Sequence, residues 1–363
     1  MTRVGIVGAG QLGRMLALSG YPLGVRCLFL DRGIDTPGAQ VAPSLIGELE
    51  DSALLAELAA RSDVVTFDWE NISGAALEPL EKITRVRPPR AALEVSQDRL
   101  AEKALFTRLK IPVAAHAAVA SREELLRAAR NIGLPGVLKT RRLGYDGKGQ
   151  FVLRTLEDVE LGWAAIGGAD LIYEKFQDFS REFSLVGARS AAGKTVFYPL
   201  SANVHAGGIL RYSVAPFSNA KLEHSARACL KRVMSALDYV GVLTIEFFVV
   251  QGRLVANEMA PRVHNSGHWT IEGCVTSQFE NHLRAVCDMP LGSTRALGHT
   301  AMINFLGLMP QRERLLALEG LAYHDYGKTP RPGRKLGHCT ILRRSPKDRD
   351  AALAKALELI EKA

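Results

Sequence analysis

The sequence has 363 residues, of which 47% are hydrophobic and 23% charged, as is typical of a globular protein with a sizeable core. Its formal net charge of +8 has two competing explanations: a surface that binds nucleic acid, or pockets that bind small anionic metabolites. The basic residues are dispersed and paired with acids, as in Arg122-Glu123-Glu124, without the aromatic-interleaved runs of a nucleic-acid surface. We therefore expect small anionic ligands and no nucleic acid.

The cysteines and the start of the chain indicate a cytoplasmic protein. The five cysteines are scattered and form no CxxC pair, so neither a disulfide framework nor a zinc site is expected. Met1-Thr2-Arg3 leads directly into a strand-like run rather than a signal peptide. No apolar run approaches the ~20 residues of a membrane span, so we expect no membrane association.

The first unit is predicted to span residues 1–95. Residues 3–7, 25–31 and 63–68 read as buried strands, with helical segments between them. Because strands and helices alternate, we expect a parallel, doubly wound sheet.

A glycine pattern, Gly8-Ala9-Gly10-Gln11-Leu12-Gly13, follows the first strand and opens the first helix. Asp31 ends the second strand, at about the distance expected of an acid that binds ribose. The pattern fits a dinucleotide, the phosphate of a ribonucleotide, or a tight turn without a ligand. We leave these alternatives open at this point.

The second unit is predicted to span residues 96–170. Residues 96–110 form an amphipathic helix for which Ser96 is a plausible N-cap. Lys139 ends a short apolar strand and is followed by the glycine-rich loop 144–150, GYDGKGQ. Loop amides and a strand lysine can hold nucleotide phosphates, although many such loops are only hairpins.

The third unit, residues 171–299, is predicted to contain a larger sheet. Residues 171–176, 183–189 and 195–200 read as its successive strands, and residues 243–261 as a hairpin. A last small unit, residues 300–363, ends in a helix.

Glu246 and Glu258 are charges embedded in the apolar strands of the hairpin. Burial of an unpaired carboxylate is unfavourable, so each needs a cation. Both could be structural acids in salt bridges. With Asn257 next to Glu258, an oxygen-rich Mg²⁺ site shared with nucleotide phosphates is the better fit.

A shared metal site requires that Glu246 and Glu258 lie on the same face of this hairpin. Side chains alternate along a strand, so a two-residue turn at 251–252 would pair Glu246 with Asn257 and turn Glu258 to the opposite face. We therefore predict an odd-length turn centred near Gly252, such as the three-residue turn 251–253, or a bulge that restores the same parity.

Several long motifs identify the chain as similar to the ATP-grasp superfamily and, within it, to the 5-(carboxyamino)imidazole ribonucleotide synthases. The resemblance covers nearly the whole chain and includes GAGQLGRML, KTRRLGYDGKGQ, NEMAPRVHNSGHWTIEG and YGKTPRPGRKLGH. The run APRVHNSGHWT is specific to this family among ATP-grasp enzymes. Residues 67–71, FDWEN, depart from the tyrosine-glutamate-phenylalanine-glutamate-asparagine of the family, but Glu70 is kept.

The resemblance implies a mixed α/β and α+β architecture. An amino-terminal Rossmann-like domain, residues 1–95, would precede a small lid domain, 96–170. A central antiparallel-sheet domain with the metal site, 171–299, and a carboxy-terminal subdomain, 300–363, would follow. The implied reaction joins bicarbonate to 5-aminoimidazole ribonucleotide with ATP and Mg²⁺, and relatives suggest a homodimer.

The resemblance also implies a role for each site residue. ATP would be held by Arg99, Lys139, the loop Gly144, Tyr145, Asp146, Gly147, Lys148, Gly149 and Gln150, the segment Glu174, Lys175, Phe176 and Gln177, and by Glu182, His205, Asn257 and Glu258. Mg²⁺ would be bound by Glu246 and Glu258. The ribonucleotide would contact Gln11, Leu12, Glu70, Asn265, Lys328, Arg334 and Lys335. The catalytic residues would be Tyr145, Asp146, Lys148, Arg262 and Lys335.

Some roles have alternatives. His205 lies in an apparently polar turn, NVHAGG, and could be structural, and the basic residues of 328–335 could form a solvated loop. A formate-dependent glycinamide ribonucleotide transformylase has a similar layout, but the run HNSGHWT argues against it. An NAD-dependent oxidoreductase would use the glycine pattern, yet no hydride-transfer site is evident. A basic nucleic-acid-binding module ranks last.

Overall fold

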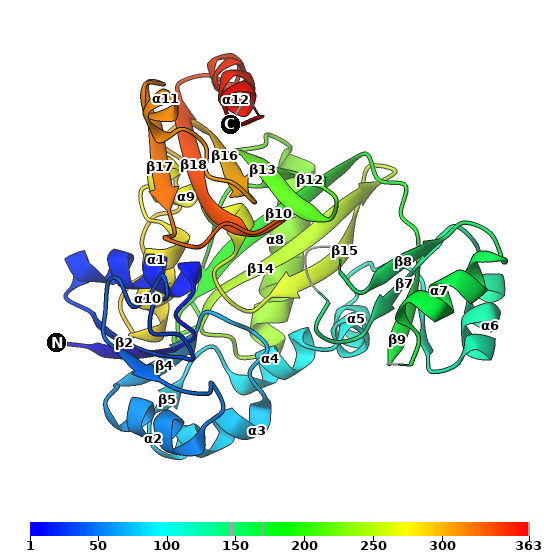
Figure 1. Ribbon diagram of the computed structural model, residues 1–363, viewed down its shortest axis with the longest axis horizontal. Coiled ribbons are helices and arrows are strands. Elements are labelled where there is room, and N and C mark those ends of the chain that lie inside the picture. The colour runs from blue at the N-terminus through cyan, green and yellow to red at the C-terminus, as the bar shows by residue number, and fades with distance from the viewer. Residues whose placement is uncertain (145–147, 169, 362–363) are drawn as a thin grey trace.

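The computed structural model describes residues 1–144, 148–168 and 170–361. Within these residues, a parallel sheet and two antiparallel sheets form the framework (Figure 1). This confirms the expected fold class. Among the described residues, no helix is both long and apolar enough to cross a membrane.

The amino-terminal domain is a five-stranded parallel sheet of order β3-β2-β1-β4-β5. The buried run RVGIV forms the central strand, and its carboxyl end leads through the glycine turn into helix α1. A doubly wound sheet of this kind places its binding crevice at the carboxyl ends of the central strands. The elements are β1 (Arg3–Val7), α1 (Gln11–Gly20), β2 (Arg26–Asp31), β3 (Ser44–Ile46), α2 (Ser52–Ala60), β4 (Val64–Phe67), α3 (Gly74–Leu77) and β5 (Arg85–Val86).

Two helices lead out of this domain. Helix α4 (Arg90–Ser96) is followed directly by α5 (Arg99–Arg108). The N-cap of α5 is Asp98, whose Oδ1 accepts a hydrogen bond from the Leu100 amide at 2.9 Å. The expected N-cap at Ser96 is therefore wrong, because Ser96 is the last residue of the preceding helix.

A small four-stranded antiparallel sheet of order β6-β9-β7-β8 carries helices α6 and α7 (Figure 1). Strands β7 and β8 flank the glycine loop and pair with each other, with Lys139 opposite Gln150. The elements are β6 (His116–Val119), α6 (Arg122–Ile132), β7 (Gly136–Thr140), β8 (Gln150–Leu153), α7 (Asp158–Ile166) and β9 (Leu171–Lys175).

Strand β9 corrects one prediction. Residues 171–176 were expected in the larger sheet, but β9 pairs with β6 and β7 inside the small one. An apolar run such as LIYEK fits any buried strand, and only its partners decide which sheet it joins. The predicted boundary at residue 170 consequently falls inside the small sheet.

The largest sheet has nine strands and is antiparallel, with the order β15-β14-β10-β12-β13-β16-β18-β17 and with β11 paired to β10. The last three strands belong to the predicted unit 300–363, so this unit extends the central sheet rather than building its own. The strands are β10 (Arg181–Arg189), β11 (Thr195–Phe197), β12 (Ser201–Ala206), β13 (Ile209–Ala215), β14 (Gly241–Val250), β15 (Arg253–Ala260), β16 (His299–Leu306), β17 (Leu321–Asp325) and β18 (Lys335–Arg343).

Helix α10 joins the central sheet to the amino-terminal domain. Its buried His282 contacts Thr66 Oγ1 through Nε2 at 2.9 Å and accepts a hydrogen bond from the Val242 amide through Nδ1 at 3.2 Å. One apolar core extends from β1 and α1 across this helix to the central sheet. The remaining helices are α8 (Ala220–Ala236), α9 (Thr270–Gly273), α10 (Gln278–Val286), α11 (Arg312–Leu316) and α12 (Pro346–Glu361).

The hairpin β14–β15 confirms the predicted parity by the second of the two routes. Val250 pairs with Arg253, so the turn is the two-residue Gln251-Gly252, with φ of 49° and 74°. The predicted three-residue turn is therefore wrong. The register shifts between Glu246 and Phe247, and this bulge places Glu246 opposite Glu258.

Candidate active site

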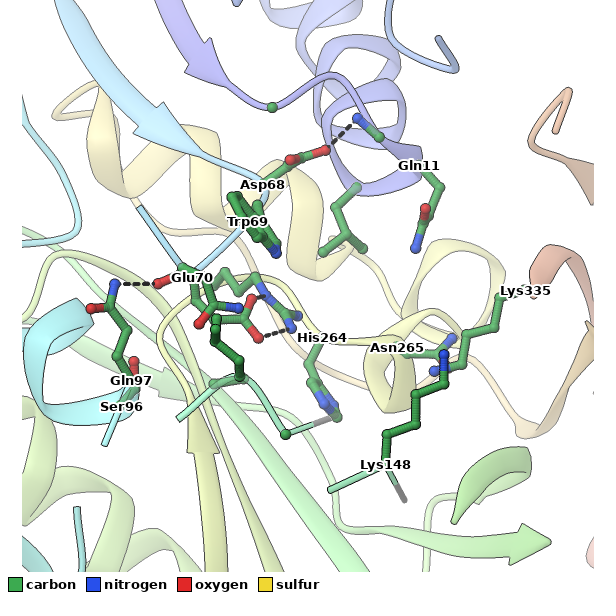
Figure 2. Close-up of a pocket in the computed structure, with 18 of the residues that line it drawn as sticks. Gln11, Asp68, Trp69, Glu70, Ser96, Gln97, Lys148, His264, Asn265 and Lys335 are labelled. Atoms are coloured by element: carbon green, nitrogen blue, oxygen red, sulfur yellow. Dashed lines mark hydrogen bonds and ion pairs between the residues drawn. The ribbon is translucent and has the colours of Figure 1, made fainter. Parts of the chain in front are cut away.

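Two cavities meet where the three sheets approach one another. The larger, about 860 Å³, lies between the carboxyl edge of the parallel sheet and the loop before β18 (Figure 2). The smaller, about 230 Å³, lies over β12, β14 and β15 and reaches the β7–β8 hairpin.

Most of the predicted site residues line one or both cavities. Gln11, Leu12, Glu70, Gly144, Arg262, Lys328 and Arg334 line the larger, and Lys139, Gln150, Glu182, His205, Glu246 and Asn257 the smaller. Arg99, Lys148, Glu258, Asn265 and Lys335 line both. Figure 2 shows Lys148 reaching toward Asn265 and Lys335 across the opening.

Two amides of the glycine turn are bound by a carboxylate of the chain itself. Asp68, directly after β4, accepts a hydrogen bond from the Gly10 amide at 2.6 Å (Figure 2). It accepts a second one from the Gly13 amide at 3.2 Å. A Cβ at Gly8, whose φ is +93°, would lie 1.9 Å from Asp68 Oδ1. The glycines therefore make room for a carboxylate of the chain itself, and the start of α1 is already neutralised.

Asp31 is committed in the same way. Its Oδ2 accepts a hydrogen bond from the Ala9 amide at 2.7 Å, and its Oδ1 accepts one from the Gly33 amide at 3.1 Å. The dinucleotide interpretation needs a free pyrophosphate site and a free acid for the ribose, and both are occupied here. The alternative in which this turn holds a ribonucleotide phosphate, which the sequence left open, is disfavoured for the same reason.

Glu70 and Arg262 form a bidentate ion pair at the floor of the larger cavity. Arg262 Nη2 donates to Glu70 Oε1 at 2.7 Å, and its Nε donates to the other oxygen (Figure 2). Burial would raise the pKa of Glu70, but the charge and hydrogen bonds of Arg262 hold that pKa below its usual value. Arg262 Nη1 also donates to the Val263 carbonyl at 3.0 Å, so two of its five N–H groups form no hydrogen bond within the described part of the chain and are open to a ligand.

The loop before β18 brings a basic cluster to the opposite wall, made of Lys328, Arg331, Arg334 and Lys335. Lys328 donates a hydrogen bond to Gln11 Oε1 and so joins the loop to α1. Burial, followed by the neighbouring Arg334, lowers the pKa of Lys328 to about 8. A ligand phosphate would meet concentrated positive charge at this wall.

Asn265 is held by a residue that the sequence did not single out. Its Nδ2 donates to Asn304 Oδ1 at 2.9 Å, and Asn304 Nδ2 donates back to Asn265 Oδ1 at 2.8 Å. Asn304 is buried and also donates to the Leu210 carbonyl at 2.8 Å. This reciprocal pair fixes the orientation of the Asn265 amide at the cavity wall.

Glu246 and Glu258 face each other where the cavities meet. Glu258 Oε2 lies 3.1 Å from Arg99 Nη1, and its side chain is 41% exposed. Glu246 is 15% exposed, and its Oε1 lies 3.8 Å from His264 Nε2. Burial and the adjacent Glu258 together raise the pKa of Glu246 to about 7.

This donor set fits a divalent cation that is shared with phosphate oxygens. Glu246, Asn257 and Glu258 line one cavity and present hard oxygen ligands, of the kind that Mg²⁺ prefers. Among the described residues no group of three or more His, Cys, Asp or Glu side chains could hold a metal alone. Two carboxylates are what a nucleotide-bound Mg²⁺ typically takes from a protein.

Lys139 belongs to a buried ionic cluster next to the carboxylates. Its Nζ donates to Glu174 Oε2 at 3.1 Å, and Lys103 Nζ lies 3.5 Å from the same oxygen. Although burial opposes it, the charges of these lysines lower the pKa of Glu174 to about 2. Glu174 Oε1 is buried and has no hydrogen-bond partner among the described residues.

His205 does not lie in a turn, which corrects its predicted setting. It lies in β12 at a register shift against β13. Its Nδ1 is hydrogen-bonded to Glu182 Oε2, and both side chains line the smaller cavity. Burial lowers the pKa of His205, but the hydrogen bond to Glu182 outweighs this and raises it above its usual value.

The other predicted nucleotide residues lie around the small sheet. Lys175 donates to the Leu134 carbonyl at 2.8 Å, Gln177 donates to the Lys175 carbonyl at 2.9 Å, and Phe176 is exposed. Gly149, with φ of +69°, lies in the turn that leads into β8. Tyr145, Asp146 and Gly147 lie outside the described residues.

Sequence reasoning missed Asp68, Asn304, Glu102 and Lys103. Asp68 could have been found, because it ends a buried parallel strand as Asp31 does, and such ends meet at the ligand crevice. Asn304 lies inside an apolar strand, where a buried amide needs partners. Glu102 and Lys103 are charged residues on α5 that are almost completely buried, which the helical pattern alone did not reveal.

Comparisons with known proteins agree with this geometry. Residues 1–97 match a ribonucleotide synthetase preATP-grasp domain, residues 104–279 an ATP-grasp domain, and residues 300–352 a phosphoribosylaminoimidazole carboxylase C-terminal domain. The N5-carboxyaminoimidazole ribonucleotide synthase of Pseudomonas aeruginosa is 46% identical over 359 residues, which is 99% of both chains.

Solved structures extend the likeness to the whole fold. The N5-carboxyaminoimidazole ribonucleotide synthetase of Thermus thermophilus superposes with a TM-score of 0.94 at 47% identity, covering 98% of each chain. The enzyme of Aspergillus clavatus, in complex with ADP and 5-aminoimidazole ribonucleotide, has a TM-score of 0.94 at 27% identity and covers 100% of this chain and 99% of its own. The chain is therefore an ATP-grasp ligase that belongs to the family of the N5-carboxyaminoimidazole ribonucleotide synthases.

Proposed function

We propose that the chain carboxylates 5-aminoimidazole ribonucleotide with bicarbonate at the expense of ATP, giving N5-carboxyaminoimidazole ribonucleotide, ADP and phosphate in purine biosynthesis. The observation that carries this proposal is the junction of the two cavities. The smaller cavity is lined by the carboxylates of Glu246 and Glu258 and by Lys139, which is suited to bind phosphate. The larger cavity is lined by the basic cluster, and five predicted site residues line both cavities. The relative from Aspergillus clavatus binds ADP and the imidazole ribonucleotide together.

The chemistry explains the need for ATP. Bicarbonate is a poor electrophile at neutral pH. If one of its oxygens attacks the γ-phosphorus, ADP leaves and carboxyphosphate forms. The exocyclic amine then attacks the carboxyl carbon, directly or after CO₂ is released nearby, and phosphate departs with that oxygen. The protein contributes position and positive charge rather than covalent chemistry.

The smaller cavity is proposed to take the phosphates of ATP. Lys139, Arg99 and the glycine loop from Gly144 to Gln150 would bind them, and the strand end at residues 174–177, Glu182 and His205 would contact the nucleoside. Glu246 and Glu258, with Asn257, would hold Mg²⁺, which when bound offsets the charge of the phosphates.

The larger cavity is proposed to take the ribonucleotide. Lys328, Arg334 and Lys335 would bind its phosphate, since that wall carries the concentrated positive charge. Gln11, Leu12, Glu70 and Asn265 would contact the ribose and base. With Asp68 repelling anions at the α1 end, the phosphate has one favourable wall and the base points toward the carboxylates.

Arg262 is proposed to orient bicarbonate and carboxyphosphate. It follows Glu258 by four residues, lines the larger cavity, and has two N–H groups that form no hydrogen bond within the described residues. Lys148 and Lys335 would stabilise charge near the amine, together with Tyr145 and Asp146. A cytoplasmic homodimer is proposed as the working form.

Product analysis tests this function directly. The purified protein is incubated with ATP and Mg²⁺ plus either bicarbonate and 5-aminoimidazole ribonucleotide, or formate and glycinamide ribonucleotide. We expect ADP release that needs the first pair together. Turnover of formate and glycinamide ribonucleotide would instead assign a transformylase. ADP release at the same rate with and without the imidazole ribonucleotide would refute the proposal.

A further inference from the structure

The bulge in β15 is the feature on which the carboxylate pair depends. Asn257 is the extra residue, because Phe247 pairs with Ala256 while Glu246 pairs with Glu258. Neighbouring residues of a regular strand point to opposite faces, yet Asn257 and Glu258 both line the smaller cavity. Without the bulge, the two-residue turn would place Asn257 opposite Glu246 and would turn Glu258 away.

A bulge interrupts the regular ladder and leaves backbone groups in need of other partners. Strand β15 is also an edge strand of the central sheet. Helix α5 runs beside this edge and supplies the missing partners. Lys103 Nζ donates to the Asn257 carbonyl at 2.8 Å, and Glu102 Oε1 accepts from the Met259 amide at 2.6 Å.

These two hydrogen bonds hold the backbone at Asn257 and Met259, the residues on either side of Glu258. Both side chains are almost fully buried, with 2% of Glu102 and 1% of Lys103 exposed. A third contact lies just before the bulge, where the Ala256 amide donates to the Pro112 carbonyl at 2.8 Å. The chain that follows α5 thus continues to hold the same edge.

We call the contacts of Glu102 and Lys103 with the β15 backbone the clamp. Helix α5, which carries both residues, is itself held in place. Its N-cap Asp98 accepts hydrogen bonds from Arg141 at 3.1 Å and 2.6 Å, and the Arg99 amide donates to the Arg141 carbonyl at 3.0 Å. Arg141 directly follows β7, the strand of Lys139. Lys103 also shares Glu174 with Lys139, at 3.5 Å and 3.1 Å. The clamp therefore ties the proposed phosphate lysine to the backbone of the proposed metal carboxylate.

We propose that Glu102 and Lys103 are positioning residues that hold the bulge at Asn257, and thereby keep Glu258 opposite Glu246 for metal binding. This inference rests on the metal site of the proposed function. Lys103 lines neither cavity, whereas Glu102 borders the larger one with its Oε1 occupied by the Met259 amide. Loss of either side chain should weaken metal binding, and loss of Lys103 should leave the affinity for the ribonucleotide nearly unchanged.

Glu102 provides a matched pair of variants. Burial raises the pKa of Glu102 to about 8, so a neutral amide is a close substitute at pH 7. Glu102→Gln keeps an oxygen acceptor for the Met259 amide, whereas Glu102→Leu removes it. Lys103→Met removes the donor to Asn257 and keeps the length of the side chain. Circular dichroism and thermal unfolding establish that each variant is folded, and the Glu102 pair suffices if Lys103→Met does not fold.

The first measurement is binding of Mn²⁺ with ADP, followed by electron paramagnetic resonance, with Glu258→Gln as the reference for a lost ligand. We expect Glu102→Leu and Lys103→Met to weaken Mn²⁺ binding at least tenfold, and Glu102→Gln less than twofold. The KM for the ribonucleotide should change less than twofold in Lys103→Met, since Lys103 lines neither cavity. Equal loss in Glu102→Gln and Glu102→Leu, or normal binding in Glu102→Leu, would overturn the clamp.

The second measurement needs no metal. Amide hydrogen exchange across residues 254–260 of the ligand-free protein should be faster in Glu102→Leu and Lys103→Met than in wild type and Glu102→Gln. Unchanged exchange would contradict the clamp. Normal Mn²⁺ binding by Glu258→Gln would instead refute the metal site itself, so the two failures can be told apart.

Discussion

Glu246→Gln should stabilise the ligand-free protein while abolishing turnover. The carboxylate of Glu246 is 15% exposed, faces Glu258, and has a pKa raised to about 7 from an ordinary 4.5. A raised folded-state pKa in an acid means that the folded form binds the proton more tightly than the unfolded form does. Ionisation therefore destabilises the fold, with an effect that grows from about pH 4.5 and levels off above pH 7.

The magnitude follows from the difference between the two pKa values. With 1.36 kcal/mol per unit, the destabilisation is about 1 kcal/mol at pH 5 and about 3 kcal/mol at pH 8. Glutamine removes the charge and keeps the shape. At pH 8 the ligand-free variant should gain about 3 kcal/mol, which corresponds to a rise in Tm of roughly 3–6 °C for a chain of this length.

Thermal unfolding of wild type and variant between pH 5 and pH 8 checks this prediction. Glu258→Gln is the comparison. It relieves the repulsion of Glu246 but also breaks the ion pair of Glu258 with Arg99 and leaves the burial of Glu246 unchanged, so its gain should be clearly smaller. Turnover should be nearly lost in both variants. A Tm difference for Glu246→Gln that is the same at pH 5 and pH 8 would refute the assignment to a desolvated charge.

Five further variants separate the remaining roles. Arg334→Ala and Lys335→Ala should each raise the KM for the ribonucleotide about tenfold and barely change that for ATP, since a charged hydrogen bond to phosphate contributes about 1.5–3 kcal/mol. Equal changes for both substrates, read from initial rates, would move them out of the ribonucleotide site. Asp68→Ala leaves buried amides unpaired and should lower the free energy of unfolding in urea by about 1–3 kcal/mol, while Asp68→Asn, which keeps an acceptor, should lose less. Asn304→Ala should raise the KM for the ribonucleotide, because the Asn265 amide would lose the two hydrogen bonds that orient it. An unchanged KM would show that Asn304 does not position Asn265 for the ribonucleotide.

The fold could be predicted from local pattern to a large extent, because strand and helix periods alternate clearly in the first 95 residues. The hairpin β14–β15 shows that the face on which a side chain lies can be predicted more reliably than the length of the turn. To place both carboxylates on one face of the sheet, the hairpin needs one residue more than a regular two-residue turn provides. The chain supplies that residue as a bulge at Asn257 rather than as a longer turn. The contacts that α5 makes with the backbone at the bulge, proposed above to hold it, come from a helix that is distant in sequence and that no local pattern connects to the hairpin.

The glycine pattern shows where local reasoning fails. A GxGxxG turn at a helix start predicts an anion site, but its occupant here is Asp68, which lies 58 residues beyond Gly10. The pattern specifies a close approach to the backbone and does not say by what. Strand β9 failed for a related reason, since an apolar run carries no information about its partners.

The transfer of an oxygen atom tests the proposed reaction most directly. Bicarbonate labelled with ¹⁸O is supplied with ATP, Mg²⁺ and 5-aminoimidazole ribonucleotide, and the phosphate released is examined by ³¹P nuclear magnetic resonance. Because the bicarbonate oxygen that attacks the γ-phosphorus stays with the phosphate, each phosphate should carry one labelled oxygen, and label should require both ATP and bicarbonate. Phosphate that forms at the same rate as the carboxylated product but carries no label would contradict activation of bicarbonate by ATP at this site.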